Sequence, residues 1–313
     1  MEQRYVGRSG LSVSRLGLGT MTWGRDTGPE EAAAQLRTFV DAGGTLVDTA
    51  DVYSGGDSER LLGRLLRDLV PRSEVVIATK AVLTPEAGRP CDASRRHLLA
   101  AVDASLSRLG VDEVELWQLH AFDPEVPLDE TLAVMDAIVA SGRAAYAGVC
   151  NYAGWQLAAA GVTQRSAGRA PIVAVQTEYS LLARDAEREL LPAAEFIGAG
   201  LLAWSPLGRG VLTGKYRTGI PADSRAATPH FAEFVRPYLD ERSRRVVESV
   251  TTAAEGLGVS PLSVALSWVR DQPGVAAAIV GARTDAQLTG VLQAEELVLP
   301  REIREALDDV SAD

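Results

Sequence analysis

Residues 45–53 read Thr-Leu-Val-Asp-Thr-Ala-Asp-Val-Tyr, and this stretch decides how the rest of the chain is interpreted. It starts as a short apolar run, which is typical of a buried strand. It ends in two acids and a tyrosine, and residues 54–56 (Ser-Gly-Gly) then predict a turn. We therefore expect Asp48 at the end of a strand and Tyr53 in the loop that follows. Alone, the stretch fits either the rim of an α/β active site or a solvated loop on which a tyrosine packs.

The pattern of apolar strand and helix repeats along the whole chain. Strands are expected at 16–19, 45–48, 75–80, 114–120, 145–151, 172–178, 201–205 and 275–281. Helices are expected at 29–42, 58–69, 92–109 (capped by Asp92), 128–140, 155–160 with its flanks, 187–199, 238–257, 261–270, 284–295 and 301–309. About eight alternations without a linker predict one α/β domain over residues 1–313, a (β/α)8 TIM barrel.

Two further segments complete the expected fold. Residues 4–16 predict a small N-terminal β-hairpin, and residues 209–237, rich in Gly and Pro, predict a long loop after strand 7. The runner-up fold is an open doubly wound sheet, which would carry a glycine fingerprint opening a helix after its first strand. Residues 17–19 (Gly-Leu-Gly) are followed by no helix opening, so the barrel is favoured.

Composition limits the function classes. The 313 residues are 46% hydrophobic, and the formal net charge is −11, which disfavours general binding to nucleic acid or to an anionic membrane. Cys91 and Cys150 are too few for a disulfide framework, and no spacing predicts a metal site. The sequence contains neither an apolar signal region nor a run of about 20 apolar residues. We therefore expect a cytoplasmic protein, and the oligomeric state stays open.

Unusual polar residues fall at or just past the expected strand ends. They are Asp48, Lys80, His120, Asn151, Gln176 and Ser205. A barrel brings such positions together on its catalytic face. Each has an ordinary alternative, such as a surface lysine, a hydrogen-bonded structural histidine or an aspartate cap, but all of these would have to coincide on one rim. His97, in an expected helix, and His230, in the expected long loop, are given no role.

Together Asp48, Tyr53, Lys80 and His120 suit proton transfer to a carbonyl oxygen. Free tyrosine has a pKa of roughly 10. A nearby Lys80 ammonium, held by Asp48, is expected to lower the pKa of Tyr53. His120 would then polarise the carbonyl by hydrogen bonding. A Schiff base on Lys80 is an open alternative, whereas no serine stands in a Gly-x-Ser-x-Gly setting.

These residues carry a resemblance to the aldo-keto reductase family over nearly the whole chain. Residues 48–53 (Asp-Thr-Ala-Asp-Val-Tyr), 79–80 (Thr-Lys) and 118–120 (Gln-Leu-His) are similar to the segments that supply the family's catalytic tetrad. Residues 7–11 and 16–21 resemble its N-terminal hairpin and first strand. The resemblance implies catalytic roles for Asp48, Tyr53, Lys80 and His120.

The same resemblance implies NADPH/NADP+ as the cofactor, with NADH as an alternative. The implied cofactor-binding residues are Gly19, Thr20, Met21, Cys150, Asn151, Gln176, Trp204, Ser205, Pro206, Leu207, Gly208, Gly210, Lys215, Gly281, Arg283 and Gln287. Of these, Trp204 would stack on the nicotinamide, and Arg283 would meet the 2′-phosphate. Cys150 replaces an expected serine, which softens carboxamide anchoring. Val291 replaces an asparagine found in many relatives.

The sequence therefore predicts an NADPH-dependent enzyme that reduces aldehydes and ketones, with a small-molecule carbonyl compound as its substrate. A cofactor-binding regulatory or channel-associated subunit is the alternative, because some relatives serve that way, and a Schiff-base lyase is a third reading. Trp23, Trp117 and Phe122 are the candidate walls of the substrate pocket, together with the 209–237 loop. For these aromatics, packing in the core is an equally good interpretation.

Overall fold

A closed barrel of eight parallel strands forms the centre of the computed structural model, which describes residues 1–84, 88–222 and 224–312. The strand order is β10-β3-β4-β5-β6-β7-β8-β9. The strands are β3 (Leu16–Gly19), β4 (Leu46–Asp48), β5 (Val76–Ala81), β6 (Val114–Leu119), β7 (Ala144–Cys150), β8 (Ile172–Glu178), β9 (Gly200–Trp204) and β10 (Val275–Val280). The expected (β/α)8 barrel is thus confirmed.

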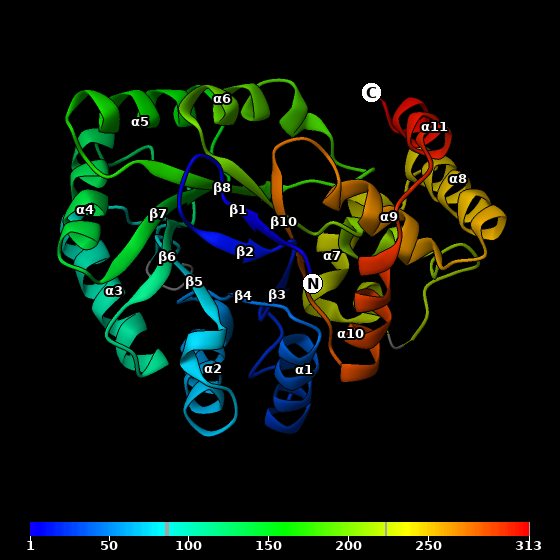
Figure 1. Cartoon of the computed structure of the whole chain (residues 1–313), viewed down its shortest axis with the longest axis horizontal. Coiled ribbons are helices and arrows are strands. Elements are labelled where there is room, and N and C mark those ends of the chain that lie inside the picture. The colour runs from blue at the N-terminus through cyan, green and yellow to red at the C-terminus, as the bar shows by residue number, and fades with distance from the viewer. Residues whose placement is uncertain (85–87, 223, 313) are drawn as a thin grey trace.

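Helices surround the barrel, as Figure 1 shows. They are α1 (Pro29–Asp41), α2 (Asp57–Asp68), α3 (Arg95–Leu109), α4 (Leu128–Ala140), α5 (Gly154–Ser166), α6 (Leu190–Ile197), α7 (Pro229–Val235), α8 (Glu241–Leu257), α9 (Pro261–Arg270), α10 (Asp285–Leu292) and α11 (Arg301–Ser311). In the part of the chain that the structure describes, no helix is both long and apolar enough to cross a membrane.

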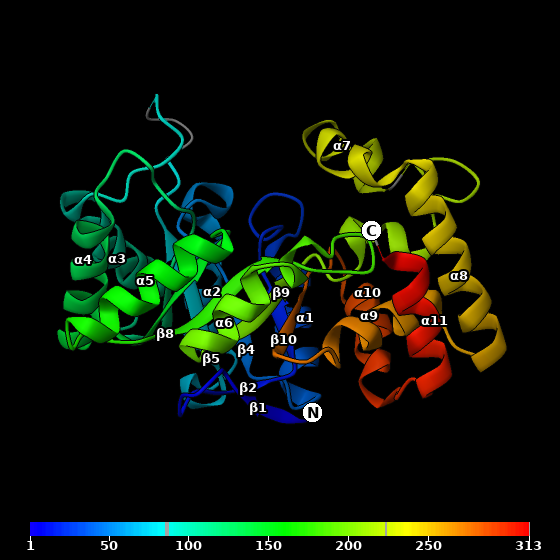
Figure 2. The same ribbon diagram turned by 90° about the horizontal axis from the view of Figure 1, so that it is seen from above.

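The expected N-terminal hairpin is confirmed as antiparallel strands β1 (Gln3–Tyr5) and β2 (Ser12–Ser14). Figure 2 shows it at one end of the barrel and α7 at the opposite end. Val6, Leu11 and Val13 pack with barrel residues such as Leu46 and Leu116 in one buried cluster. The hairpin therefore closes the amino-terminal end of the barrel, which leaves the carboxyl ends of the strands for a site.

The segment after β9 is not the single loop that the sequence suggested. It contains the 3-10 turns Gly208–Thr213, Arg225–Ala227 and Arg236–Tyr238, and also helix α7, which begins with Pro229 at its first position. Proline is favoured there because the missing N–H would have no helical partner in any case. His230, expected in a loop, consequently lies in α7.

Several expected helix ends also shift. Asp92 does not cap α3, because its N–H bonds to the Val82 carbonyl and keeps it on the segment paired with the end of β5. Ser94 is the N-cap instead, and its hydroxyl accepts from the His97 N–H at 3.4 Å. The helix expected over 187–199 is reduced to α6, which ends at Gly198 in the left-handed region (φ 85°). The helix expected from 238 begins only after Asp240, whose carboxylate caps α8.

Candidate active site

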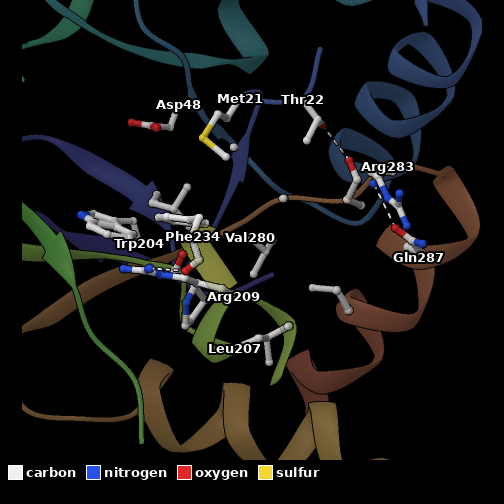
Figure 3. A pocket seen from close by; sticks show the side chains of 18 of the residues that line it. Met21, Thr22, Asp48, Trp204, Leu207, Arg209, Phe234, Val280, Arg283 and Gln287 are labelled. Carbon is white, nitrogen blue, oxygen red and sulfur yellow. Dashed lines mark hydrogen bonds between the residues drawn. The ribbon is translucent and has the colours of Figure 1, made fainter. Parts of the chain in front are cut away.

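A cavity of about 650 Å³ opens at the carboxyl ends of the barrel strands. Its lining includes Asp48, Tyr53 and His120 from the residues expected to be catalytic. Figure 3 shows Trp204 and Phe234 at one side of the cavity and Arg283 and Gln287 at the other. Side chains far apart in the sequence therefore meet at one face, as the strand-end positions predicted.

Lys80 forms the buried centre of the site. Its ammonium nitrogen lies 2.6 Å from Oδ2 of Asp48, 2.8 Å from the Thr49 carbonyl oxygen and 3.4 Å from the Tyr53 hydroxyl. The register that pairs Asp48 of β4 with Ala78 of β5 sets this arrangement, because Lys80 follows two residues later on the same face of the strand. The three contacts match the three donors of an ammonium group.

The carboxylate of Asp48 is fixed from two sides. Gln176, from β8 across the barrel, donates its side-chain N–H to Oδ1 at 2.8 Å, while Lys80 holds Oδ2. Gln176 therefore contacts the Asp48–Lys80 pair directly in addition to lining the cavity.

Tyr53 stands on a tight turn, the 3-10 segment Tyr53–Gly56. Ser54, Gly55 and Gly56 all have positive φ, and the Ser54 hydroxyl binds the Trp23 carbonyl oxygen at 2.8 Å. The Tyr53 and His120 rings meet edge to face, with centroids 5.9 Å apart. The turn thus brings the tyrosine hydroxyl back over Lys80 and beside the histidine.

Electrostatics at this cluster correct one expectation. Burial raises the pKa of Tyr53 above its ordinary value, and the opposing effect of the Lys80 charge does not reverse that direction. Burial alone would lower the pKa of Lys80, but the Asp48 carboxylate raises it overall. The lowered pKa expected for Tyr53 is therefore wrong, because the loss of hydration on burial outweighs the effect of the Lys80 charge.

His120 is neutral in this environment. Burial, and then the nearby Lys80 charge, lower the pKa of its imidazole to about 3. Its Nδ1 atom is buried and has no hydrogen-bond partner among the described residues. A neutral imidazole, a protonated phenol and a fixed ammonium therefore lie together, which suits hydrogen bonding and proton donation to a neutral oxygen.

Most of the residues expected to hold the cofactor line the cavity. They are Gly19, Met21, Asn151, Gln176, Trp204, Ser205, Pro206, Leu207, Gly210, Lys215, Gly281, Arg283 and Gln287. Thr20, Cys150 and Gly208 do not. Thr20 and Cys150 are fully buried, and the Cys150 sulfur lies 3.6 Å from Oε1 of Gln118 inside the barrel. Gly208 turns against Leu182 with φ 53°.

Asn151 and Trp204 are linked to each other beside His120. The Trp204 indole N–H donates to Oδ1 of Asn151 at 3.0 Å, and the Asn151 amide donates to the His120 carbonyl oxygen at 3.0 Å. Asn151 adopts φ 57°, in the left-handed region that asparagine tolerates better than most residues. This backbone turn at the end of β7 aims its amide across the rim.

Arg209 lines the cavity as part of the 209–237 segment expected there, but the contacts of its side chain were not predicted. Its guanidinium makes two hydrogen bonds to the Glu178 carboxylate, at 2.8 and 2.5 Å, and another to the Phe234 carbonyl oxygen. It also lies 3.7 Å from the Phe234 ring centroid, and the Phe234 and Trp204 rings stack with an interplanar angle of 18°. Arg209 thereby joins α7 to the end of β8.

The far side of the cavity lies at the start of α10. Thr284 caps this helix by accepting from the Gln287 N–H, and the Gln287 side chain in turn accepts from the Arg283 N–H at 3.0 Å. Leu262, Ala286, Gly290 and Val291 add an apolar surface beside it. An arginine at a helix N-terminus is suited to a phosphate group.

The three aromatic residues expected as pocket walls do not line the cavity, which corrects that expectation, whereas the 209–237 segment does line it, through residues such as Arg209 and Phe234. Trp23 is fully buried and donates its indole N–H to Gln35 at 3.0 Å. Trp117 is buried in the main hydrophobic cluster outside the barrel, because it alternates with inward-facing Leu116. Phe122 packs edge to face on Tyr152 and Trp155.

The apolar lining comes instead from Val52, Leu83, Phe234, Ile279 and Val280. In the sequence, Val52 directly precedes Tyr53, and Leu83 follows Lys80 by three residues. This proximity to expected site residues could have identified both as lining residues. Phe234 belongs to the 209–237 segment expected to line the pocket, but its own position there depends on the fold of α7. Across residues 1–84, 88–222 and 224–312, no group of three or more His, Cys, Asp or Glu side chains is placed to hold a metal ion.

Comparisons with known proteins agree with this geometry. The sequence model of the Aldo/keto reductase family matches residues 15–312. The Bacillus subtilis (strain 168) protein named Uncharacterized oxidoreductase YrpG is 37% identical over 325 residues, covering 99% of this chain and 96% of its own. A rice protein (Oryza sativa subsp. japonica) named Probable voltage-gated potassium channel subunit beta is 36% identical over 317 residues, covering 100% of this chain and 96% of its own. An Arabidopsis thaliana protein with the same name is 34% identical over 303 residues, covering 95% of this chain and 92% of its own.

Proposed function

The chain belongs to the aldo/keto reductase family, and from that premise we propose that it is an NADPH-dependent reductase of aldehydes and ketones acting as one domain over residues 1–313. The observation that carries the proposal is the Tyr53 hydroxyl, 3.4 Å from an ammonium that is itself anchored on Asp48. A protonated phenol in that position is a proton donor whose conjugate base would be stabilised as soon as it forms.

The residues that line the cavity suit a dinucleotide. Aromatic Trp204 and the amides of Asn151 and Gln176 lie near the catalytic cluster, which suits a nicotinamide ring and its carboxamide. Arg283 lies at the other side, at the start of α10. When bound, NADPH would supply the hydride that reduces the carbonyl carbon. Trp204 would stack on the nicotinamide ring, and Arg283 would bind the 2′-phosphate, which favours NADPH over NADH.

Tyr53 is the proposed acid. It donates its proton to the carbonyl oxygen as negative charge develops there, and Lys80 stabilises the phenolate that remains. Asp48 keeps the ammonium in place and charged. His120 hydrogen-bonds the same carbonyl oxygen as a neutral imidazole, because its lowered pKa of about 3 prevents it from carrying a charge at neutral pH.

The substrate is proposed to be a small carbonyl compound with an uncharged apolar group. Val52 and Leu83 flank the catalytic residues on the cavity wall, and Phe234 adds an aromatic side chain. The acid of the catalytic cluster, Asp48, is already paired with Lys80, so no unpaired carboxylate of that cluster is left to bind a cationic substrate.

A channel-associated regulatory role is the second candidate, because relatives from rice and Arabidopsis are named as probable potassium channel β subunits. One experiment separates the two. NADPH fluorescence quenching measures cofactor binding, and a panel of aldehydes measures turnover. Binding together with turnover supports the reductase. Binding without turnover of any carbonyl overturns it and favours the regulatory role. Borohydride trapping of a substrate on Lys80 would instead indicate a Schiff base.

A further inference from the structure

Asp51 lies between two of the proposed catalytic residues, Asp48 and Tyr53, yet it takes no part in the proposed reaction. Its backbone N–H donates to the Lys80 carbonyl oxygen at 3.0 Å, so the residue is fixed beside β5. Its Oδ1 atom is shielded from solvent and has no hydrogen-bond partner in the part of the chain that the structure describes. A carboxylate oxygen in that position is costly when charged.

The charged group with the largest effect on Asp51 is Glu59 on α2, which is fully buried. One Glu59 oxygen accepts from the Thr79 hydroxyl at 2.6 Å, and the other binds Nε of Arg108 at 2.6 Å. Thr79 is the residue before Lys80. A chain of contacts therefore runs from the proposed catalytic lysine through Thr79 and Glu59 to Arg108 on α3.

Arg108 also supports the turn that carries Tyr53. Gly56, the last residue of that turn, approaches Arg108 so closely that a Cβ atom there would lie 2.8 Å from Cδ of the arginine. Arg108 thus contacts both Glu59 and the turn. The groups whose charges act on Asp51 are Glu59 from α2, Arg108 from α3 and Lys80 from β5.

Both cations near Asp51 are already paired with other carboxylates. Lys80 is neutralised by Asp48, and Arg108 is neutralised by Glu59. A second carboxylate beside Glu59 would therefore add a negative charge for which neither cation is left. Such a charge is relieved either by binding a proton or by moving toward water. Movement of Asp51 would carry Tyr53, two residues away, with it.

We propose that Asp51 is a positioning residue that must keep its proton for the turn that carries Tyr53 to keep its contact with Arg108, which Glu59 binds. The expected effect on kcat/KM rests on the proposed reductase function, whereas the expected effect on thermal stability does not rest on it. Burial, and then the charge of Glu59, raise the pKa of Asp51 to about 7. The contact between the turn and Arg108 is therefore weakened as the pH rises through neutrality.

Among the proposed catalytic residues, Tyr53, Lys80 and His120 have pKa values shifted away from neutrality. An alkaline decline in kcat/KM with a midpoint near 7 would therefore report Asp51. We expect wild-type kcat/KM to fall about tenfold per pH unit above 7, since a single group loses its proton at that rate. The Asp51→Asn variant, neutral at every pH, is expected to keep a flat profile to pH 9.

Thermal unfolding gives a readout that needs no substrate. Because the folded-state pKa of Asp51 lies above the unfolded value of roughly 4, its stabilising effect is fully present below that value and is lost as the pH rises through about 7. Relative to Asp51→Asn, the wild type is therefore expected to lose about 5 °C of melting temperature between pH 5.5 and pH 9. Asp68→Asn, an exposed acid at the end of α2, is the matched control and should follow the wild type.

The outcomes are distinguishable. Parallel pH profiles and parallel melting curves for wild type and Asp51→Asn would overturn the role of Asp51. If no carbonyl is reduced at any pH, the proposed function fails, and the melting curves still decide the role of Asp51. Should Asp51→Asn not fold, Glu59→Gln is the deciding variant. Removing the charge of Glu59 lets Asp51 ionise more readily, so the decline must move to lower pH, and an unmoved decline would contradict the proposal.

Discussion

The Lys80 ammonium lies 2.6 Å from Oδ2 of Asp48, and both side chains are buried at the end of the barrel. A buried ion pair of this kind has a cost in lost hydration that only the complete pair offsets. The chemistry proposed for the site explains why the pair lies next to the Tyr53 hydroxyl. The pair holds the positive charge of Lys80 at the place where a phenolate would form.

Breaking that pair is expected to destabilise the fold. Asp48→Asn or Lys80→Met alone should lower the free energy of unfolding by about 3–5 kcal/mol, because each leaves an uncompensated buried group. The double variant should lose clearly less than the sum of the two. Urea unfolding of the four proteins measures this coupling. Additive losses would show that Asp48 and Lys80 do not depend on each other.

Arg283 is expected to distinguish the two nicotinamide cofactors. Arg283→Ala should weaken NADPH binding by about tenfold or more, the equivalent of one charge-assisted hydrogen bond, and should leave NADH binding almost unchanged. Fluorescence titration of both cofactors checks it. Arg301→Ala, an exposed arginine on α11, serves as the control. Equal losses for NADPH and NADH would remove Arg283 from recognition of the 2′-phosphate.

Arg209 is expected to hold α7 in place. Lysine cannot reproduce both its paired hydrogen bonds to Glu178 and its stacking on Phe234, so Arg209→Lys should expose the 220–240 segment to protease. Cofactor binding should weaken with it, because Phe234 lines the cavity. Arg217→Lys is the matched control, since Arg217 makes an exposed ion pair with Glu248 nearby. Identical proteolysis of the two variants would contradict the role of Arg209.

The strands and the rim residues were predictable from the sequence because their signals are local. An apolar run followed by a polar residue identifies the end of a parallel strand, and barrel closure then brings Asp48, Lys80 and His120 together. The burial of each side chain, and its effect on the pKa, was less predictable. The raised pKa of Tyr53 depends on how deeply its side chain is buried, and the same holds for Asp51.

Pocket walls were the hardest part to predict. Trp23 and Trp117 were expected as pocket walls, but both side chains are buried in the core, the alternative that the sequence left open. Arg209 and Phe234 enter the site through a segment with weak periodicity, where positive φ at Ser205 and Arg209 redirects the chain. The sequence therefore indicated this segment as a pocket wall, but no local pattern of residue types identified which of its side chains reach the cavity.

Replacement of the Tyr53 hydroxyl tests the proposed proton donor most directly. The measurement is the single-turnover rate of NADPH oxidation by an excess of a small aldehyde, with wild type and Tyr53→Phe, after NADPH affinity has been determined for both. We predict that cofactor affinity stays within about twofold and that the rate falls by about 10²–10⁴-fold, the range for loss of a general acid. A Tyr53→Phe protein that oxidises NADPH at close to the wild-type rate would contradict the proposed mechanism.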